Sequence, residues 1–210
     1  FNVFGYEDAA AVINAAERMN RPVVLMTNKV AVAHMGIPVL AGMLLEMARR
    51  SEVPTCVHLD HATELADIRQ AVDSGYTSVM IDGSQLPFDE NVAVTRAAVE
   101  IARPRGVSVE AEIGIVTGHE GREFHIEEPG AAYTDPELAA RFVRDTGIDA
   151  LAASVGTVHG FYATQPKLDF DRIEKIKELT GLPLVMHGGS GISVEDTQRA
   201  IRCGIRKINY

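Results

Sequence analysis

The stretch Pro54-Thr55-Cys56-Val57-His58-Leu59-Asp60-His61 decides the fold that the sequence predicts. It begins as a short apolar strand and ends in two imidazoles and a carboxylate. Burying such groups without partners is costly, so a strand that ends in them normally directs them into a site. The alternative is a strand end whose polar side chains simply meet water. The rest of the chain distinguishes the two, because an apolar strand that ends in a reactive polar residue recurs throughout.

The composition is that of an ordinary globular protein. Its 210 residues are enough for one substantial core, and no linker, low-complexity run or repeat divides them. The formal net charge of −9 argues against a surface that binds nucleic acid or an anionic membrane. No apolar run reaches membrane-spanning length and no signal peptide is visible, so we expect a cytoplasmic protein. Cys56 and Cys203 are expected to be buried thiols rather than a disulfide framework.

Strand and helix patterns alternate along the whole chain. Short apolar strands are predicted at residues 1–3, 22–27, 54–61, 77–82, 107–113, 149–154, 182–186 and 207–209. The segments between them carry apolar residues at spacings of three and four, which indicates amphipathic helices. This alternation is typical of a parallel sheet covered by helices.

Eight strands favour a closed barrel over an open doubly wound sheet, and no glycine-rich nucleotide fingerprint follows the first strand. We therefore predict an α/β fold of the (β/α)8 TIM-barrel type, as a single domain over residues 1–210. The first and last predicted strands look truncated. We therefore expect the barrel to lack its terminal segments here and to be the core of a longer chain.

A segment rich in glycine and charge, about residues 114–133, interrupts this alternation. Loops of that length without structure of their own are usually lids or disordered segments. Glu120 lies there between Gly118 and Gly121, and could swing over a bound substrate as a general base. The alternative for Glu120 is an ordinary solvated loop acid.

All the predicted strands end in a hydrogen-bonding or ionisable group. Because a TIM barrel carries its active site at the carboxyl ends of its strands, we expect these side chains to converge there. In chain order they are Asn2, Thr27, Asp60 with His61, Asp82, Glu112, Ser154 with His159 beyond it, His187 and Asn209. We assign Asn2 and Thr27, at the first two ends, to substrate binding.

The histidines among these strand ends, His61, His159 and His187, point to a metal. Three imidazoles with an open fourth position are a common way to hold a catalytic Zn²⁺ ion. Their spacing matches no local zinc motif, so the alternative is three ordinary strand-end histidines. Asp82 and Glu112 could bind a second divalent or a monovalent cation, or orient the histidines.

The run His187-Gly188-Gly189-Ser190-Gly191 suggests a phosphate site. Its glycines expose backbone N–H groups and allow close approach of a ligand, and the start of the following helix favours an anion. The loops after the last two strands are where such barrels often bind phosphate. The alternative is a tight turn with no ligand.

Several motifs recur in a familiar order along the chain: His58-Leu59-Asp60-His61, Val79-Met80-Ile81-Asp82-Gly83-Ser84, Val109-Glu110-Ala111-Glu112, Val155-Gly156-Thr157-Val158-His159-Gly160, Pro166-Lys167-Leu168-Asp169-Phe170 and His187-Gly188-Gly189-Ser190-Gly191. Together they resemble the class II, metal-dependent ketose-bisphosphate aldolases, which include the fructose- and tagatose-bisphosphate aldolases. The resemblance extends from Phe1 to Asn209.

The resemblance implies that His61, His159 and His187 hold a catalytic zinc ion and that Asp60 donates a proton to the aldehyde oxygen. It implies that Glu120 removes the proton at carbon 1. Asp82 and Glu112 would lie near an alternative metal position. Contacts to dihydroxyacetone phosphate are implied for Gly160, Gly188, Gly189, Ser190 and Asn209.

These observations predict a lyase that reversibly cleaves a ketose 1,6-bisphosphate, fructose or tagatose, to dihydroxyacetone phosphate and glyceraldehyde 3-phosphate. One alternative is a related aldolase acting on another phosphorylated ketose or a keto sugar acid. Another is a non-catalytic sugar-phosphate sensor. A Schiff-base aldolase is disfavoured because no lysine ends a predicted strand. The family is usually dimeric or tetrameric, so a homo-oligomer is expected.

Overall fold

The structure is a computed structural model that describes residues 1–114, 118–123, 133–157, 159–161 and 166–210. Of residues 118–123 and 159–161 only the backbone is described. The chain divides into two compact units: unit 1 comprises Phe1–Asp82 and Ala93–Glu110, and unit 2 comprises Gly83–Val92 and Ala111–Tyr210. The prediction that residues 1–210 form a single domain stays a prediction.

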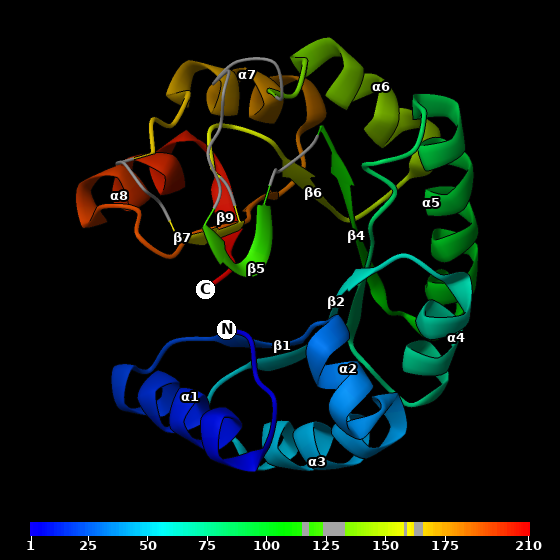
Figure 1. Cartoon of the computed structure of the whole chain (residues 1–210), viewed down its shortest axis with the longest axis vertical. Helices are drawn as coiled ribbons and strands as arrows, with labels where there is room; N and C mark the ends of the chain where they lie inside the picture. Colours follow the sequence, from blue (N-terminus) through cyan, green and yellow to red (C-terminus); the bar gives the residue numbers. More distant parts are fainter. Residues whose placement is uncertain (115–117, 124–132, 158, 162–165) are drawn as a thin grey trace. The chain divides into compact units, whose positions relative to one another are not determined.

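Unit 1 is built from parallel strands and the helices that connect them (Figure 1). Its elements are α1 (Tyr6–Met19), β1 (Val23–Thr27), α2 (Lys29–Met35), α3 (Ile37–Arg50), β2 (Thr55–Ala62), α4 (Leu65–Asp73) and β3 (Ser78–Ile81), with the short 3-10 helix Arg103–Arg105. The strand order is β1-β2-β3 and then β4 (Ser108–Ile113). Helix α5 (Phe88–Ala102) and strand β4 each contain residues of both units.

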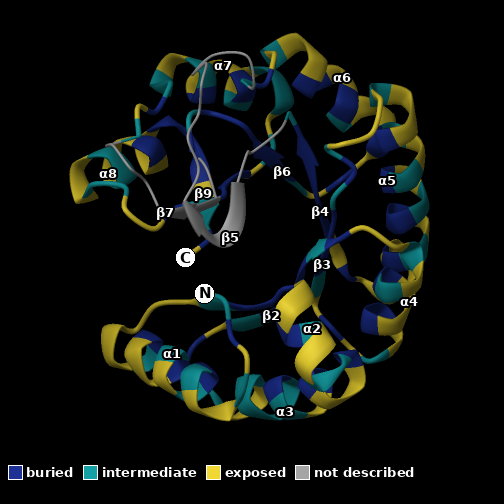
Figure 2. Ribbon diagram, viewed as in Figure 1, coloured by how far each residue is buried: buried dark blue, intermediate teal, exposed yellow. Residues whose placement is uncertain are grey.

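Local sequence accounts for these elements. Asn28 caps α2, because its side-chain oxygen accepts hydrogen bonds from the backbone N–H groups of Val30 and Ala31, both at 3.1 Å. Helix α3 packs against β2 through buried residues at spacings of three and four, namely Ile37, Leu40, Ala41 and Leu44. In Figure 2 the strands are largely buried, whereas the helices also carry exposed residues. The core therefore lies between strands and helices.

Strand β2 contains one more residue than the facing part of β3. Leu59 pairs with Val79 and Ala62 pairs with Ile81, so three steps on β2 face two steps on β3. His61 lies within this bulge and has a φ of 51°. The left-handed conformation costs a residue with a Cβ roughly 1–2 kcal/mol. The sheet thus holds His61 against its backbone preference, and such bulges are common next to active sites.

Unit 2 repeats the same alternation. Its elements are α6 (Pro136–Thr146), β6 (Ala150–Ala153), α7 (Phe170–Thr180), β8 (Leu184–Met186), α8 (Val194–Cys203) and β9 (Ile205–Ile208). The strand order is β4-β6-β8-β9, and the β6–β8 and β8–β9 pairs are parallel. A separate parallel pair consists of β5 (Gly118–Glu123) and β7 (His159–Phe161).

The predicted strands and helices are largely confirmed, with two corrections. Residues 1–3 were predicted as a strand, but Asn2 forms only an isolated bridge with Met26. The predicted loop at residues 114–133 was expected to have no structure of its own, which is wrong for residues 118–123 because they form β5. A period-two apolar pattern is missing from β5, so its pairing with β7 left no signal in the sequence.

Among the described residues, no single helix is both long and apolar enough to cross a membrane. The pair α2 and α3 meets the length and composition criteria together, but is bent by 102°.

Candidate active site

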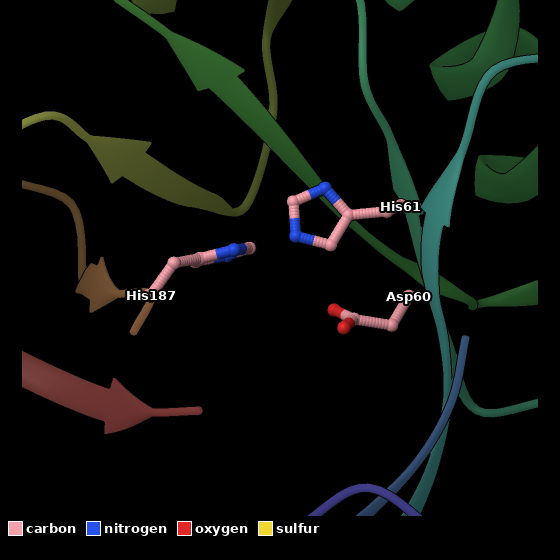
Figure 3. A group of neighbouring side chains, drawn as sticks. All are labelled: Asp60, His61 and His187. Atoms are coloured by element: carbon pink, nitrogen blue, oxygen red, sulfur yellow. The ribbon is translucent and has the colours of Figure 1, made fainter. Parts of the chain in front are cut away.

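Asp60 and His61 lie near the carboxyl end of β2, and both side chains leave the strand on the same side (Figure 3). Successive residues of a regular strand point to opposite faces. The bulge and the positive φ of His61 interrupt that alternation here. Asp60 is 2% exposed and the His61 side chain is 18% exposed. A carboxylate and an imidazole that are adjacent in the sequence can therefore serve one site.

His61 is oriented by a carboxylate on the neighbouring strand end. Its Nδ1 lies 2.8 Å from Oδ2 of Asp82, which directly follows β3. The backbone N–H of Asp82 donates to the carbonyl oxygen of Ala62 at 2.7 Å, which holds the two strand ends together. An ionised carboxylate only accepts hydrogen bonds, so Nδ1 of His61 carries the proton and Nε2 carries the lone pair. A metal-binding histidine is commonly oriented in this way.

His58 lies in a buried cluster beneath this strand end. Its Nδ1 is 2.8 Å from Oγ of Ser78, and its Nε2 is 3.6 Å from Oδ1 of Asp60 and 3.8 Å from Oε2 of Glu110. His58 is 1% exposed, and Asp60 and Glu110 are each 2% exposed. Candidate ligand atoms of these three residues all lie within 4.8 Å of one another. Unit 1 therefore concentrates three ionisable side chains behind the end of β2.

Thr27 is packed inside unit 1. Its hydroxyl donates to the carbonyl oxygen of His58 at 3.4 Å and lies 2.9 Å from the hydroxyl of Tyr76. Thr27 is 0% exposed and Tyr76 is 1% exposed. Burial raises the pKa of the Tyr76 hydroxyl, which keeps it protonated and able to donate. These contacts support a role for Thr27 in fixing β2, and its predicted substrate contact, like that of Asn2, stays a prediction.

In unit 2, His187 directly follows β8 (Figure 3) and Glu112 lies in β4. They are 1% and 2% exposed. Nδ1 of His187 lies 3.8 Å from Oε2 of Glu112, which is beyond hydrogen-bond distance. The carboxylate thus lies on the Nδ1 side of this ring, as in the pair of His61 and Asp82. The backbone at Glu112 is held by Asn91, whose Nδ2 donates to its carbonyl oxygen at 3.0 Å.

The glycine-rich loop after β8 contacts the end of β9. The N–H of Gly189 donates to the carbonyl oxygen of Asn209 at 2.9 Å. A Cβ at position 189 would lie 2.5 Å from Cγ2 of Ile208 and 2.9 Å from that same oxygen. Only glycine permits this close approach of two backbone segments. Unit 2 therefore brings together the loop and Asn209, both predicted to contact the substrate, with Ser190 exposed on the same loop.

Only the backbone is described for three of the predicted site residues. Glu120 belongs to β5, and His159 and Gly160 belong to β7. Their strands pair in parallel, with Gly118 facing His159 in the backbone register. Their catalytic, metal-binding and substrate-binding roles stay predictions.

The sequence did not single out Glu110 or Ser78. Glu110 and Glu112 are two apart in β4, and this spacing is the sequence signal that could have found Glu110. Both residues are buried in the structure. Two carboxylates at period two in an otherwise apolar strand place both on one face. Ser78 begins β3 and gives no such signal, because serine at a strand start is commonplace.

Known proteins resemble this chain over its whole length. The family model of the class-II fructose-bisphosphate aldolases matches residues 1–210. A fructose-bisphosphate aldolase from Geobacillus stearothermophilus is 45% identical over 214 residues, which cover 100% of this chain and 73% of that protein.

Solved structures share the fold. The YdjI aldolase of Escherichia coli K12 superposes with a TM-score of 0.89 at 37% identity, over 100% of this chain and 74% of that one. The fructose-bisphosphate aldolase of Campylobacter jejuni, at 24% identity, has a TM-score of 0.83 over 100% of this chain and 70% of that one, and shows the fold alone. The predicted (β/α)8-barrel class is confirmed.

The shared fold and the family match define a (β/α)8-barrel lyase that carries out aldol chemistry. The chain belongs to the class-II fructose-bisphosphate aldolase family. The predicted resemblance and enzyme class are therefore confirmed, and the described residues include groups of histidine and carboxylate side chains that could hold a metal ion.

Proposed function

We propose that this aldolase catalyses the zinc-dependent, reversible cleavage of a ketose 1,6-bisphosphate, fructose or tagatose, to dihydroxyacetone phosphate and glyceraldehyde 3-phosphate. One observation carries the proposal. The buried carboxylate of Asp60 is adjacent to His61, whose Nδ1 is held at 2.8 Å by Asp82. Aldol cleavage needs a proton acceptor beside an electrophile, and this strand end offers a carboxylate beside an oriented metal ligand.

The donor set fits zinc. His61, His159 and His187 supply three imidazoles, which leaves a fourth coordination position for substrate. In the two described cases a carboxylate lies on the Nδ1 side of the ring, Asp82 at 2.8 Å and Glu112 at 3.8 Å, which favours Nε2 as the metal-binding atom. We assign both carboxylates to orienting the histidines, with a second divalent or a monovalent cation as the alternative. When bound, the zinc ion would act as a Lewis acid toward the ketose carbonyl oxygen.

The side chains of this protein then handle the protons. Asp60 accepts the proton of the hydroxyl on carbon 4 while the bond between carbons 3 and 4 breaks. The bonding electrons pass to the carbonyl at carbon 2 and leave an enediolate. Glu120 returns a proton to carbon 3 of the ketose, which becomes carbon 1 of dihydroxyacetone phosphate, and this step completes that product. In the condensation direction Glu120 removes that proton, and Asp60 protonates the new alkoxide.

The phosphate of dihydroxyacetone phosphate is assigned to the glycine-rich loop. Backbone N–H groups of Gly188 and Ser190, together with the Ser190 hydroxyl, are suitable donors to phosphate oxygens. The hydrogen bond from the N–H of Gly189 to the carbonyl oxygen of Asn209 ties the loop to the end of β9. This bond supports a loop that is preorganised for the ligand. Gly160 and Asn209 complete the proposed contacts.

A related aldolase acting on another phosphorylated ketose or a keto sugar acid is the main alternative. Cleavage assays with fructose and tagatose bisphosphates side by side, coupled to detection of dihydroxyacetone phosphate, test the narrower proposal. Turnover of neither sugar would reject it. A cytoplasmic location and a homo-oligomeric state stay predictions.

Removal of the metal is expected to abolish cleavage, and added Zn²⁺ is expected to restore it. His61→Ala should lower both bound zinc and kcat by orders of magnitude, because one of three protein ligands is lost. Metal analysis of the purified variant and a cleavage assay check this prediction. His34→Ala is the matched control, because His34 is exposed in the last turn of α2. Full activity in chelator, or covalent trapping by borohydride with substrate, would contradict the zinc mechanism.

Asp82→Asn is expected to weaken zinc binding by about 10- to 100-fold, the usual effect of losing a carboxylate behind a metal-binding histidine. The neutral amide would no longer enforce the tautomer with the proton on Nδ1 of His61. Competition against a chelator of known affinity measures the change. Asp73→Asn is the control, because Asp73 is exposed at the end of α4 and 3.4 Å from Arg105. Equal zinc affinities of the two variants would show that Asp82 does not orient the ligand.

A further inference from the structure

We propose that His58 is a positioning residue for Asp60, the group assigned above to proton transfer. This inference rests on the proposed function. His58 and Asp60 are two apart on β2, so a regular strand places them on one face, and both are almost fully buried at 1% and 2% exposure. Nε2 of His58 lies 3.6 Å from Oδ1 of Asp60.

The two ring nitrogens of His58 have different partners. Nδ1 lies 2.8 Å from the hydroxyl of Ser78, whereas Nε2 faces carboxylate oxygens of Asp60 at 3.6 Å and Glu110 at 3.8 Å. An ionised carboxylate cannot donate, so with Asp60 and Glu110 both ionised the ring nitrogen that faces them carries the proton. Ser78 can accept or donate, and is therefore compatible with that assignment. The hydroxyl of Ser78 anchors the ring, and the N–H on Nε2 is directed at the carboxylates.

This arrangement restrains Asp60. A carboxylate at the end of a strand can rotate about its χ angles, and a proton acceptor that is misplaced by about 1 Å can lose on the order of 100-fold in rate. Nε2 is beyond hydrogen-bond distance of Oδ1 of Asp60, so the N–H acts on that oxygen by charge–dipole attraction, which favours one orientation of the carboxylate. Oε2 of Glu110 lies at nearly the same distance from Nε2 as Oδ1 of Asp60, so the same N–H is attracted to both carboxylates. His58 thus acts on the reaction through Asp60, without contact with the substrate.

Two substitutions separate the two ring nitrogens. The side-chain amide of Asn lies at about the place of Nδ1 of histidine. His58→Asn can therefore keep the bond to Ser78, but it loses the N–H toward Asp60. The longer Gln places its amide near the Nε2 position, so His58→Gln can keep the N–H toward Asp60 and lose the bond to Ser78. If His58 has a purely structural role through Ser78, His58→Asn should keep the higher kcat. If His58 positions Asp60, His58→Gln should keep the higher kcat.

We expect His58→Asn to lower kcat for ketose-bisphosphate cleavage by about 10- to 100-fold with little change in KM, the range seen for outer-shell partners of functional groups. His58→Gln should recover most of that loss. Glu120, and not Asp60, would catalyse exchange of the hydroxymethyl proton of dihydroxyacetone phosphate with solvent. The rate of this exchange should therefore stay within about twofold of wild type in both variants, the usual deviation between independent sites. Bound zinc should be unchanged.

A double-mutant cycle makes the inference specific. In an Asp60→Asn background, His58→Asn should cause no further loss of kcat, because the residue through which His58 acts is already gone. Additive losses, or a higher kcat in His58→Asn than in His58→Gln, would overturn the inference. If His58→Asn does not fold, His58→Gln provides the test: a folded His58→Gln enzyme whose kcat falls about 10-fold or more at unchanged bound zinc would also overturn it. Lack of any turnover by wild type would instead reject the proposed function.

Discussion

Asp60→Asn is expected to lower kcat for ketose-bisphosphate cleavage by about 100- to 10,000-fold, the usual contribution of a positioned general acid or base. Asparagine has nearly the same shape as aspartate, but its amide cannot take up the proton of the hydroxyl on carbon 4. Asp60 is only 2% exposed, so solvent is poorly placed to replace it. Steady-state cleavage kinetics measure the loss.

The control for Asp60→Asn is a partial reaction of the same protein. Exchange of the hydroxymethyl proton of dihydroxyacetone phosphate with solvent does not involve the aldehyde oxygen, so it should persist in the variant. Persistent exchange would also show that the metal and phosphate sites are intact. If exchange and cleavage fall together, Asp60 supports the metal site rather than transferring the proton of the aldehyde oxygen.

Gly156→Ala is expected to be the most destabilising single substitution considered, with a loss of at least about 3 kcal/mol in the free energy of unfolding. Gly156 follows β6 with a φ of 109°, a conformation that alanine adopts only with strain. A Cβ there would lie 2.3 Å from the carbonyl oxygen of Lys167 and 3.2 Å from the hydroxyl of Tyr133. That carbonyl is part of the backbone and also accepts the Tyr133 hydroxyl at 3.3 Å, so it cannot move aside without losing this bond.

Gly181→Ala separates steric overlap from backbone strain. Gly181 ends α7 with a φ of 68°, and a Cβ there would meet no atom within 4 Å. Gly181→Ala should therefore lower the free energy of unfolding by only about 1 kcal/mol. Denaturant unfolding of both variants measures the difference. Equal losses would mean that the segment containing Lys167 shifts readily, and that Gly156 is needed only for its φ.

The α/β class was predictable because its signal is local. The strands β1, β3 and β8 are short apolar runs with polar residues directly after them, and α3 shows its buried face as a spacing of three and four. Strand β5 was not predictable, since its residues have no period-two apolar pattern and pair with β7 far along the chain. Residues 1–3 have strand-like composition, but only one bridge to β1 forms.

The membership of the site was more predictable than its geometry. Asp60, His61 and Asp82 were identified because each is polar at the end of an apolar strand. That Asp82 lies behind Nδ1 of His61 depends on the register between β2 and β3, which includes a bulge that no sequence pattern reveals. The contacts of His58 with Ser78 and Glu110 likewise depend on three strands coming together.

At position 61 the residue that activity requires differs from the residue that stability favours, because His61 has a left-handed backbone conformation. Glycine there would relax the backbone by roughly 1–2 kcal/mol and remove the imidazole at the same time. Selection for thermal stability alone would therefore favour loss of the histidine, and only selection for activity would retain it. Alanine leaves the backbone strain in place, so His61→Ala reports the cost of the missing imidazole without this compensation. In stability-driven engineering of this enzyme, position 61 is one to hold fixed.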